Sequence, residues 1–369
     1  MNQVTIAFQI FLIAIGCAWI FPLVLTWVRY DRLPHARYAF IFILSAPLML
    51  LDNVLVVFNW HVPFSYLLGL FDFIPVLLIV LSFLSVQKML LERPEKPSRH
   101  LWVVVFFALL QFPFLLMNPE AKVLINVSPV VGEFKIFWFV YLYQLLVAIV
   151  VLAYAAFILL DLNAYKNHLP EHTADTGFYK VKSLTVMHAM MLAVSATAIV
   201  TVLLVALDLS YIAVWQFGLV MLYSFSLWLV AMVLVEKRLY APSPINYFSL
   251  HHKQLNEQDM QLILDKADAA IVENKIYRKK GIRLRQLCDL SGIEPTEFAI
   301  ACREIQGKTF RDFIFHYRLE YAKLLLSQTD TKVSVVARKL GFDSEKSLSE
   351  MFERYVEKLT KEHDASKEG

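Results

Sequence analysis

Residues 284–310, LRQLCDLSGIEPTEFAIACREIQGKTF, and residues 333–352, VSVVARKLGFDSEKSLSEMF, decide how the C-terminal part of this chain folds. In each stretch a short helical pattern is interrupted by a glycine, Gly292 or Gly341, and a second helical pattern follows. A glycine at such a turn lets the backbone take a positive φ without a side-chain clash. Pro295 then opens the next helix at a position where proline costs no hydrogen bond. Each stretch therefore predicts a helix-turn-helix unit.

The remainder of the chain is much more apolar than these two units. The 369 residues are 58% hydrophobic, whereas soluble domains are typically about 45–50% apolar. Up to residue 235 there are 12 Lys and Arg and 11 Asp and Glu, but from residue 236 onward there are 23 and 21. This shift in composition predicts a membrane domain over residues 1–238, a linker over 239–255 and a soluble domain with an acidic tail over 256–369.

Seven stretches of the first part are long and apolar enough to cross a bilayer, which takes about 20 residues. The predicted fold is therefore all-α, with a seven-helix transmembrane bundle followed by a soluble double helix-turn-helix domain. The predicted spans are Val4–Val28, Tyr38–Phe58, Phe64–Met89, Leu101–Met117, Phe137–Leu160, Ser183–Leu207 and Tyr211–Val235.

Lysine and arginine are concentrated in alternate connections between these spans. Twelve of them lie in the first, third and fifth connections and after the last span, whereas the other connections hold only Lys122 and Lys135. Because basic residues are retained on the cytoplasmic side, this distribution predicts an inner-membrane protein with its N-terminus outside and its C-terminal domain in the cytoplasm.

Five polar or aromatic residues near the predicted outer face form a candidate signal site: Asp52, Asn53, Trp60, His61 and Asp72. A carboxylate at membrane depth is costly unless it is paired or faces water. The same residues are also consistent with helix capping near the interface or with packing, and that alternative stays open.

From Ile282 onward the sequence resembles the AraC-type family of bacterial transcription regulators, over roughly residues 256–356. The resemblance rests on the two helix-turn-helix units, on the Gly307-Lys308-Thr309-Phe310 segment and on the pattern of the helix that joins the units. The matching framework residues are Gly292, Gly307, Arg318, Ala322, Ala337, Gly341, Phe342 and Phe352.

This resemblance implies that the second helix of each unit enters a major groove of double-stranded DNA. Base contacts are then expected from Thr296, Glu297, Ile300 and Arg303 in the first unit, and from Asp343, Ser344, Lys346, Ser347 and Arg354 in the second. Phosphate contacts are expected from Arg283, Arg285, Arg311, Lys332, Arg338 and Lys339.

The sequence departs from the family pattern in ways that weaken the expected DNA surface. Ile300, Glu350 and Glu353 stand where a basic residue is usual, and Glu294, Glu297 and Glu345 add further acidic charge. Carboxylates repel phosphates, although an acceptor can read cytosine. Weak binding by a monomer is therefore expected, and a homodimer is one way to strengthen it.

Three classes of function follow from these features. The first is a membrane-embedded one-component regulator that senses a small molecule, an ion or the state of the lipid bilayer and binds promoter DNA. The alternative is a membrane receptor or scaffold whose degenerate helix-turn-helix domain binds a protein partner. A transporter that reports its own flux is a third, motivated by Asp52 and Asp72. No catalytic motif, cofactor motif or metal-ligand spacing is present among the motifs considered, so an enzyme is not expected.

Overall fold

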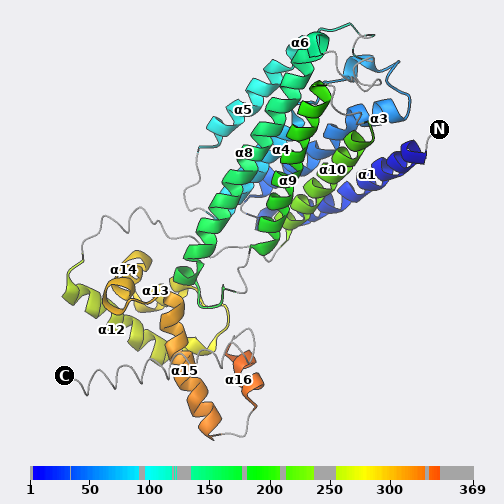
Figure 1. Cartoon of the computed structure of the whole chain (residues 1–369). Helices are drawn as coiled ribbons and strands as arrows, with labels where there is room; N and C mark the ends of the chain where they lie inside the picture. Colours follow the sequence, from blue (N-terminus) through cyan, green and yellow to red (C-terminus); the bar gives the residue numbers. More distant parts are fainter. Residues whose placement is uncertain are drawn as a thin grey trace. The chain divides into compact units, whose positions relative to one another are not determined.

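The computed structural model describes residues 3–33, 35–90, 96–118, 120, 122, 134–176, 181–207, 213–236, 255–328 and 332–340. The chain forms two compact units. The apolar unit comprises Met1–Ala164 and Val181–Leu239, and the polar unit comprises Tyr165–Lys180 and Tyr240–Gly369. Apart from one isolated bridge between Thr173 and Arg283, regular structure in the described residues is helical (Figure 1), which confirms the all-α prediction for them.

Long helices build the apolar unit, and several are interrupted by short irregular segments. Proline explains one interruption, since Pro47 has no N–H to donate and lies in the 3-10 segment η2, Ala46–Leu50, between α2 and α3. The helices are α1 Gln3–Arg29, α2 Ala36–Ser45, α3 Leu51–Val57, α4 Ile74–Leu90, α5 Pro97–Leu110, α6 Phe112–Leu115, α8 Phe134–His172, α9 Lys182–Ala206 and α10 Ala213–Val235.

The predicted count of seven spans is not confirmed. Judged by length and composition, six helical segments of the described chain could cross a membrane, and α4 falls short of them with 17 residues. The predicted span Phe64–Met89 begins too early, because turns and the 3-10 segment η3, Ser65–Leu67, occupy the residues before Ile74. Gly69, with a φ of +75°, lies among these turns and marks one that a helix cannot continue through.

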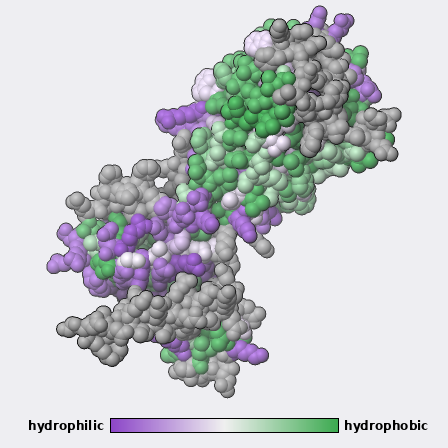
Figure 2. Space-filling model, viewed as in Figure 1, coloured by the Kyte–Doolittle hydropathy of each residue, from purple (hydrophilic) through white to green (hydrophobic). Residues whose placement is uncertain are grey.

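Large apolar side chains cover the outside of the apolar unit. Examples that are more than 60% exposed are Ile10, Trp27, Trp102, Leu109 and Leu160. The hydrophobic colouring of this unit in Figure 2 shows the same property on the face in view. An apolar surface of this kind is rare on soluble monomers, and together with the six long apolar helices it indicates a multi-pass membrane protein.

The polar unit contains helices of the two predicted helix-turn-helix motifs, the helix that precedes these motifs and the helix that joins them. They are α12 Glu257–Asn274, α13 Leu284–Ser291, α14 Pro295–Gln306, α15 Phe310–Gln328 and α16 Val333–Lys339, with the 3-10 segment η6 Ile276–Arg278 after α12. The buried faces of α12, α13, α14 and α15 share a core that includes Leu264, Ile271, Leu287, Phe298 and Ile314, whereas α16 packs against α15 in a separate cluster.

The helix α8 contributes to both units. It is 39 residues long and continues to His172, well beyond the predicted end of its membrane span at Leu160. Its residues from Tyr165 onward, and the segment that follows, belong to the polar unit. The fall in hydropathy after Leu160 marks where the apolar stretch stops, but the sequence remains compatible with a helix as far as Pro170.

Candidate DNA-binding domain and signal site

The first helix-turn-helix consists of α13 and α14, and Gly292 makes the turn between them. Gly292 has a φ of +67°, and the N–H of Ile293 donates to the Cys288 carbonyl at 3.2 Å, which closes the end of α13. A Cβ at Gly292 would meet no atom within 4 Å. The position therefore favours glycine through its backbone conformation rather than through lack of space.

The connection from α14 to α15 also depends on a glycine with a positive φ and on local hydrogen bonds. Gly307 ends α14 with a φ of +61°. The Asp312 N–H then donates to Thr309 Oγ1 at 3.3 Å, and the Thr309 N–H donates to Asp312 Oδ2, also at 3.3 Å. This reciprocal capping satisfies donors at the start of a helix that would otherwise lack partners, so it fixes where α15 begins.

Aromatic packing holds α14 against α15. The side chain of Phe298 is fully buried, and its ring centroid lies 6.0 Å from that of Phe310 and 5.2 Å from that of Phe313, both edge to face. Edge-to-face contacts at these distances are favourable beyond the area they bury. The recognition helix of the first unit is therefore fixed rigidly to the joining helix.

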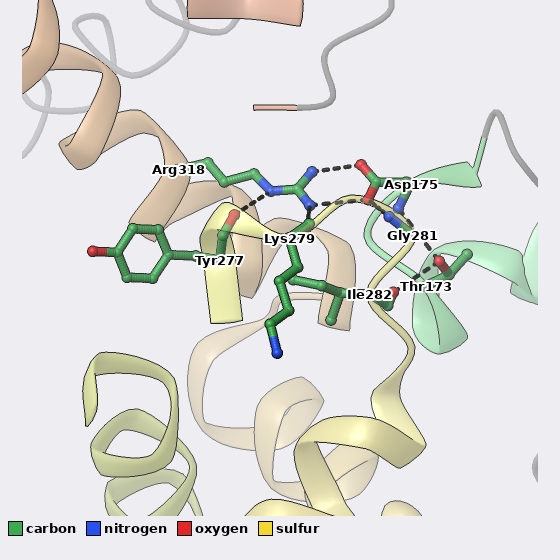
Figure 3. A network of polar contacts seen from close by, with 7 residues as sticks. All are labelled: Thr173, Asp175, Tyr277, Lys279, Gly281, Ile282 and Arg318. Atoms are coloured by element: carbon green, nitrogen blue, oxygen red, sulfur yellow. Dashed lines mark hydrogen bonds and ion pairs between the residues drawn. The ribbon is translucent and has the colours of Figure 1, made fainter. Parts of the chain in front are cut away.

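Arg318 of α15 is the centre of a buried polar network (Figure 3). Its Nη1 and Nη2 atoms donate to Asp175 Oδ1 and Oδ2 at 2.5 and 2.9 Å. Its Nε donates to the Tyr277 carbonyl at 3.0 Å, and Nη2 also donates to the Lys279 carbonyl at 2.8 Å. Arg318 is fully buried and Asp175 is 5% exposed, so each charge depends on the other for its stability.

The segment around Asp175 is held by the polar unit through its backbone as well. The Ala174 N–H donates to the Ile282 carbonyl at 3.2 Å, and Thr173 Oγ1 donates to the same carbonyl at 2.9 Å. Asp175 Oδ2 also accepts from the Gly281 N–H at 2.5 Å. A segment that lies in sequence between two apolar helices thus completes the fold of the helix-turn-helix domain.

One residue of α8 contacts the recognition helix of the first unit. Glu171 Oε1 forms an ion pair with Arg303 Nη2, whose side chain is 57% exposed. Arg303 is one of the four residues of this helix that the sequence predicts to contact bases. In this conformation its guanidinium is occupied by a carboxylate of the same polar unit.

The other predicted base contacts of α14 differ in how available they are. Thr296 is buried, and its Oγ1 donates to Glu294 Oε1 at 2.6 Å. Glu297 and Ile300 are half-buried. Among the predicted phosphate contacts, Arg283, Arg285 and Lys332 are exposed, and the Arg311 guanidinium lies 5.1 Å from the centroid of the Phe315 ring.

The second helix-turn-helix is described only in its first helix, α16. Ala337 is buried there against the joining helix α15, together with Val336 and Leu340, and Ala322 is buried on the facing side. The remaining predicted residues of this unit lie outside the described residues: Gly341, Phe342, Asp343, Ser344, Lys346, Ser347, Phe352 and Arg354. The side chains of Arg338 and Lys339 also lie outside them.

The apolar unit contains a cavity of about 400 Å³. It is lined by residues of several helices and by Asn53 and Asp72, two members of the predicted signal site. Asp52 lies outside the lining, and its Oδ2 accepts from the Gly69 N–H at 2.9 Å. Trp60 and His61 do not line the cavity; the Trp60 ring instead packs against Phe58.

Both cysteines of the polar unit are buried. Burial raises the pKa of Cys288 and of Cys302 to about 12. Both belong to the core between α12, α13 and α14. Within the described residues, no group of three or more His, Cys, Asp or Glu side chains could hold a metal ion.

Several residues of these sites are absent from the sequence-based candidates. Glu171 lies in the polar last turn of α8 and Asp175 in the connection that follows, and neither matches a motif. Only the resemblance-based placement of Arg318 in the joining helix indicates that an acidic partner is required. Gln111, Tyr143 and Tyr223 line the cavity, but each is a single polar residue within an apolar span.

The comparisons with known proteins concern the C-terminal part alone. Residues 287–362 match a family model described as a helix-turn-helix domain. No curated protein and no solved structure matches the chain significantly. The matched region spans the end of α13, the whole of α14 and α15, and α16. Residues 287–362 are therefore a helix-turn-helix domain of the AraC type, carried by a chain with six long apolar helices.

Proposed function

We propose that this chain is a membrane-embedded one-component transcription regulator, in which the apolar unit senses a signal and the polar unit binds promoter DNA. The observation that carries the proposal is which segments of the chain make up the polar unit. It combines an AraC-type helix-turn-helix domain with Tyr165–Lys180, a segment that follows directly from an apolar helix in the sequence. A shift or rotation at the end of α8 would therefore act on the DNA-binding domain through Asp175 and Arg318.

The Glu171–Arg303 ion pair supports a regulated rather than a permanently active domain. While Glu171 holds Arg303, that guanidinium is not available to a base edge or a phosphate, and the carboxylate adds negative charge beside the DNA. Movement of the last turn of α8 would free the Arg303 guanidinium and would at the same time remove the negative charge of Glu171 from the DNA surface. The signal would thus control DNA affinity at the first recognition helix.

The proposal requires the polar unit to lie in the cytoplasm, and this depends on whether α4 crosses the membrane. Fourteen of its 17 residues are buried, and Ser82 within it bonds to His188 of α9 at 2.9 Å. A helix of this length spans about 26 Å, close to the roughly 30 Å of the hydrocarbon core. We infer that α4 is a seventh, central span, which puts the two termini on opposite sides. A reporter fused after Gly369 should be active in the cytoplasm and silent in the periplasm.

DNA binding is tested with the full chain in lipid nanodiscs and a fragment from upstream of its own gene. If about six basic residues meet phosphates, raising salt fourfold should weaken binding by roughly 10³-fold. Double replacement of Arg285 and Lys332 by glutamine should lower both the affinity and the salt slope. Binding that does not change with salt, or no binding at 50 mM salt or below, would contradict the proposal.

A receptor or scaffold with a protein partner remains the second candidate, because α14 and the residue before it expose two acidic side chains against one basic side chain, Arg303. Glu294 and Glu304 are exposed, and Glu297 is half-buried. Replacing Glu294 and Glu304 by glutamine strengthens DNA binding if this surface faces phosphates, but weakens capture of a protein partner if it is a protein-binding surface. Homodimer formation also stays a prediction, and the mass of the solubilised chain tests it.

A further inference from the structure

The cavity of the apolar unit has a chemistry that selects a class of ligand. Its volume of about 400 Å³ falls in the range of about 300–1,000 Å³ that small-molecule sites occupy. Most of its wall is aliphatic, with Val147, Val151, Val194, Val202 and Leu219 among the lining residues. A ligand that fills it must therefore carry a sizeable apolar body.

A single carboxylate interrupts this apolar wall. Among the described residues that line the cavity, Asp72 is the only one with a charged side chain, and it is accessible rather than packed away. A carboxylate in apolar surroundings is costly unless it meets a cation or strong hydrogen-bond donors. The described residues of the lining include no lysine, arginine or histidine, so a bound ligand can supply a positive charge at Asp72. The buried Lys122 lies nearby, over the ring of the lining residue Phe114, but is not itself part of the lining.

Aromatic rings line the same cavity. They belong to Phe139, Tyr143 and Tyr223, and to Phe114, whose ring already faces the Lys122 ammonium at 5.9 Å. The faces of such rings attract cations, most strongly where water is excluded. Together with one carboxylate they favour a cationic group over a neutral or an anionic one.

Two buried polar atoms of lining residues also lack partners. Gln111 Nε2 donates to the Leu70 carbonyl at 3.1 Å, whereas Gln111 Oε1 has no hydrogen-bond partner among the described atoms. The Tyr223 hydroxyl is likewise buried without a described partner. Buried polar groups are rarely left unsatisfied, and an ammonium group, with several N–H donors, suits both Gln111 Oε1 and the Asp72 carboxylate.

We propose that this cavity binds an amphipathic small molecule with a protonated amine, with Asp72 as the counter-charge and the aliphatic wall around its apolar body. The proposal rests on the proposed sensing function and names the chemical class of its signal. A bare metal ion would leave the aliphatic wall unused, and an anion would be repelled by Asp72. A lipid chain could enter the cavity but would leave the carboxylate without a partner.

Three probes of equal chain length and different charge test the proposal: octylamine, 1-octanol and octanoate. Each is titrated calorimetrically into the purified full chain in detergent, with the heat of empty micelles subtracted. Octylamine should bind about tenfold or more tightly than octanol, as expected for a desolvated cationic contact, and octanoate should bind most weakly. Equal affinities for octylamine and octanol in the unaltered chain would overturn the proposal.

Variants assign the preference to this cavity. Asp72→Asn should erase the difference between amine and alcohol, whereas Asp31→Asn, which removes a carboxylate away from the cavity, should keep it. Ala198→Phe should weaken both probes by filling the cavity, and Ala193→Phe, at an exposed position of the same helix outside the lining, should not. An amine preference that survives Asp72→Asn would overturn the proposal. Because probe binding requires no DNA, a chain that binds octylamine but no DNA would refute only the proposed function.

Discussion

Arg318 and Asp175, which are 143 residues apart in the sequence, form a two-pronged ion pair in the core of the polar unit. Arg318 belongs to the helix that joins the two helix-turn-helix motifs, and Asp175 follows α8, a helix that begins in the apolar unit. The DNA-binding domain is thus linked to the apolar part of the chain twice: once through the connection after α10, and once through a segment built into its own core.

Replacing Asp175 by asparagine should destabilise the polar unit strongly. The variant leaves the fully buried Arg318 charge without a counter-charge, and breaking a buried pair in this way costs about 3–5 kcal/mol. Hydrogen exchange of amides in α15 of the full chain in detergent measures this cost. The control is Glu320→Gln, which removes the partially exposed pair with Lys323 at 2.8 Å and should cost less than about 1 kcal/mol. Equal costs for the two variants would contradict a structural role for the Arg318–Asp175 pair.

A fragment that starts at Tyr240 should be unstable, because it lacks Asp175 while keeping Arg318. Adding a peptide of residues 165–180 should raise its melting temperature in proportion to the logarithm of peptide concentration above the dissociation constant. The same peptide with Asp175→Asn is the matched control and should have little effect. A fragment that is already fully stable without peptide would show that the segment does not complete the fold.

Replacing Glu171 by glutamine should strengthen DNA binding by the full chain. The change frees Arg303 and removes one negative charge, which we expect to raise affinity about threefold to fivefold, less than about 1 kcal/mol, because the Arg303 side chain is largely exposed. Gel-shift titration of the nanodisc-embedded chain measures it. Glu257→Gln, on the exposed first turn of α12, controls for charge alone. The gain should vanish in the double variant with Arg303→Gln, and a gain that persists there would rule out release of Arg303 as its cause.

The turn at Gly292 should tolerate asparagine better than alanine. Its φ of +67° costs alanine about 1 kcal/mol or slightly more, and nothing within 4 Å adds a steric penalty. Asparagine adopts this conformation more readily, so Gly292→Asn should cost less. Amide hydrogen exchange in α13 and α14 measures the free-energy cost of each substitution. A cost of several kcal/mol for alanine would mean that its side chain clashes with a neighbouring atom.

Cys288 and Cys302 should resist alkylation until the polar unit opens. A pKa of about 12 in place of the ordinary 9.0 lowers the thiolate fraction at pH 8 about 10³-fold, since each pH unit is tenfold. The raised pKa also means that stability is intact below about pH 9 and is lost as the pH rises from there toward 12, because only the unfolded thiols ionise. Mass spectrometry after iodoacetamide treatment measures the rate. Asp175→Asn should accelerate labelling, and fast labelling of the unaltered chain would contradict the burial of these thiols.

The helix-turn-helix elements were predictable because their signals are local. Gly292, Pro295 and Gly307 set backbone conformations within a few residues of themselves, and the structure places the turn and the helix ends at these positions. The apolar helices were predictable for a similar reason, since a run of about 20 apolar residues is a property of the local sequence.

Features that depend on distant contacts were not predictable in this way. Packing within the polar unit accounts for the extension of α8 to His172 and for the ion pair of Asp175 with Arg318. No periodic pattern in the connection after α8 predicts either feature. The late start of α4 has a more local cause, the turns around Gly69. Two residues of the predicted signal site, Asn53 and Asp72, line the cavity. The amide and hydroxyl residues that also line it, Gln111, Tyr143 and Tyr223, come from spans that are otherwise largely apolar.

The central claim is that an intact chain held in the membrane binds DNA through its AraC-type domain. Genome-wide mapping of DNA cross-linked to the full-length protein in living cells tests it most directly. The account predicts enrichment at a small number of promoters, and loss of that enrichment in the Arg285 and Lys332 double variant at equal protein level. Enrichment no greater than that of an unrelated multi-pass membrane protein would contradict it.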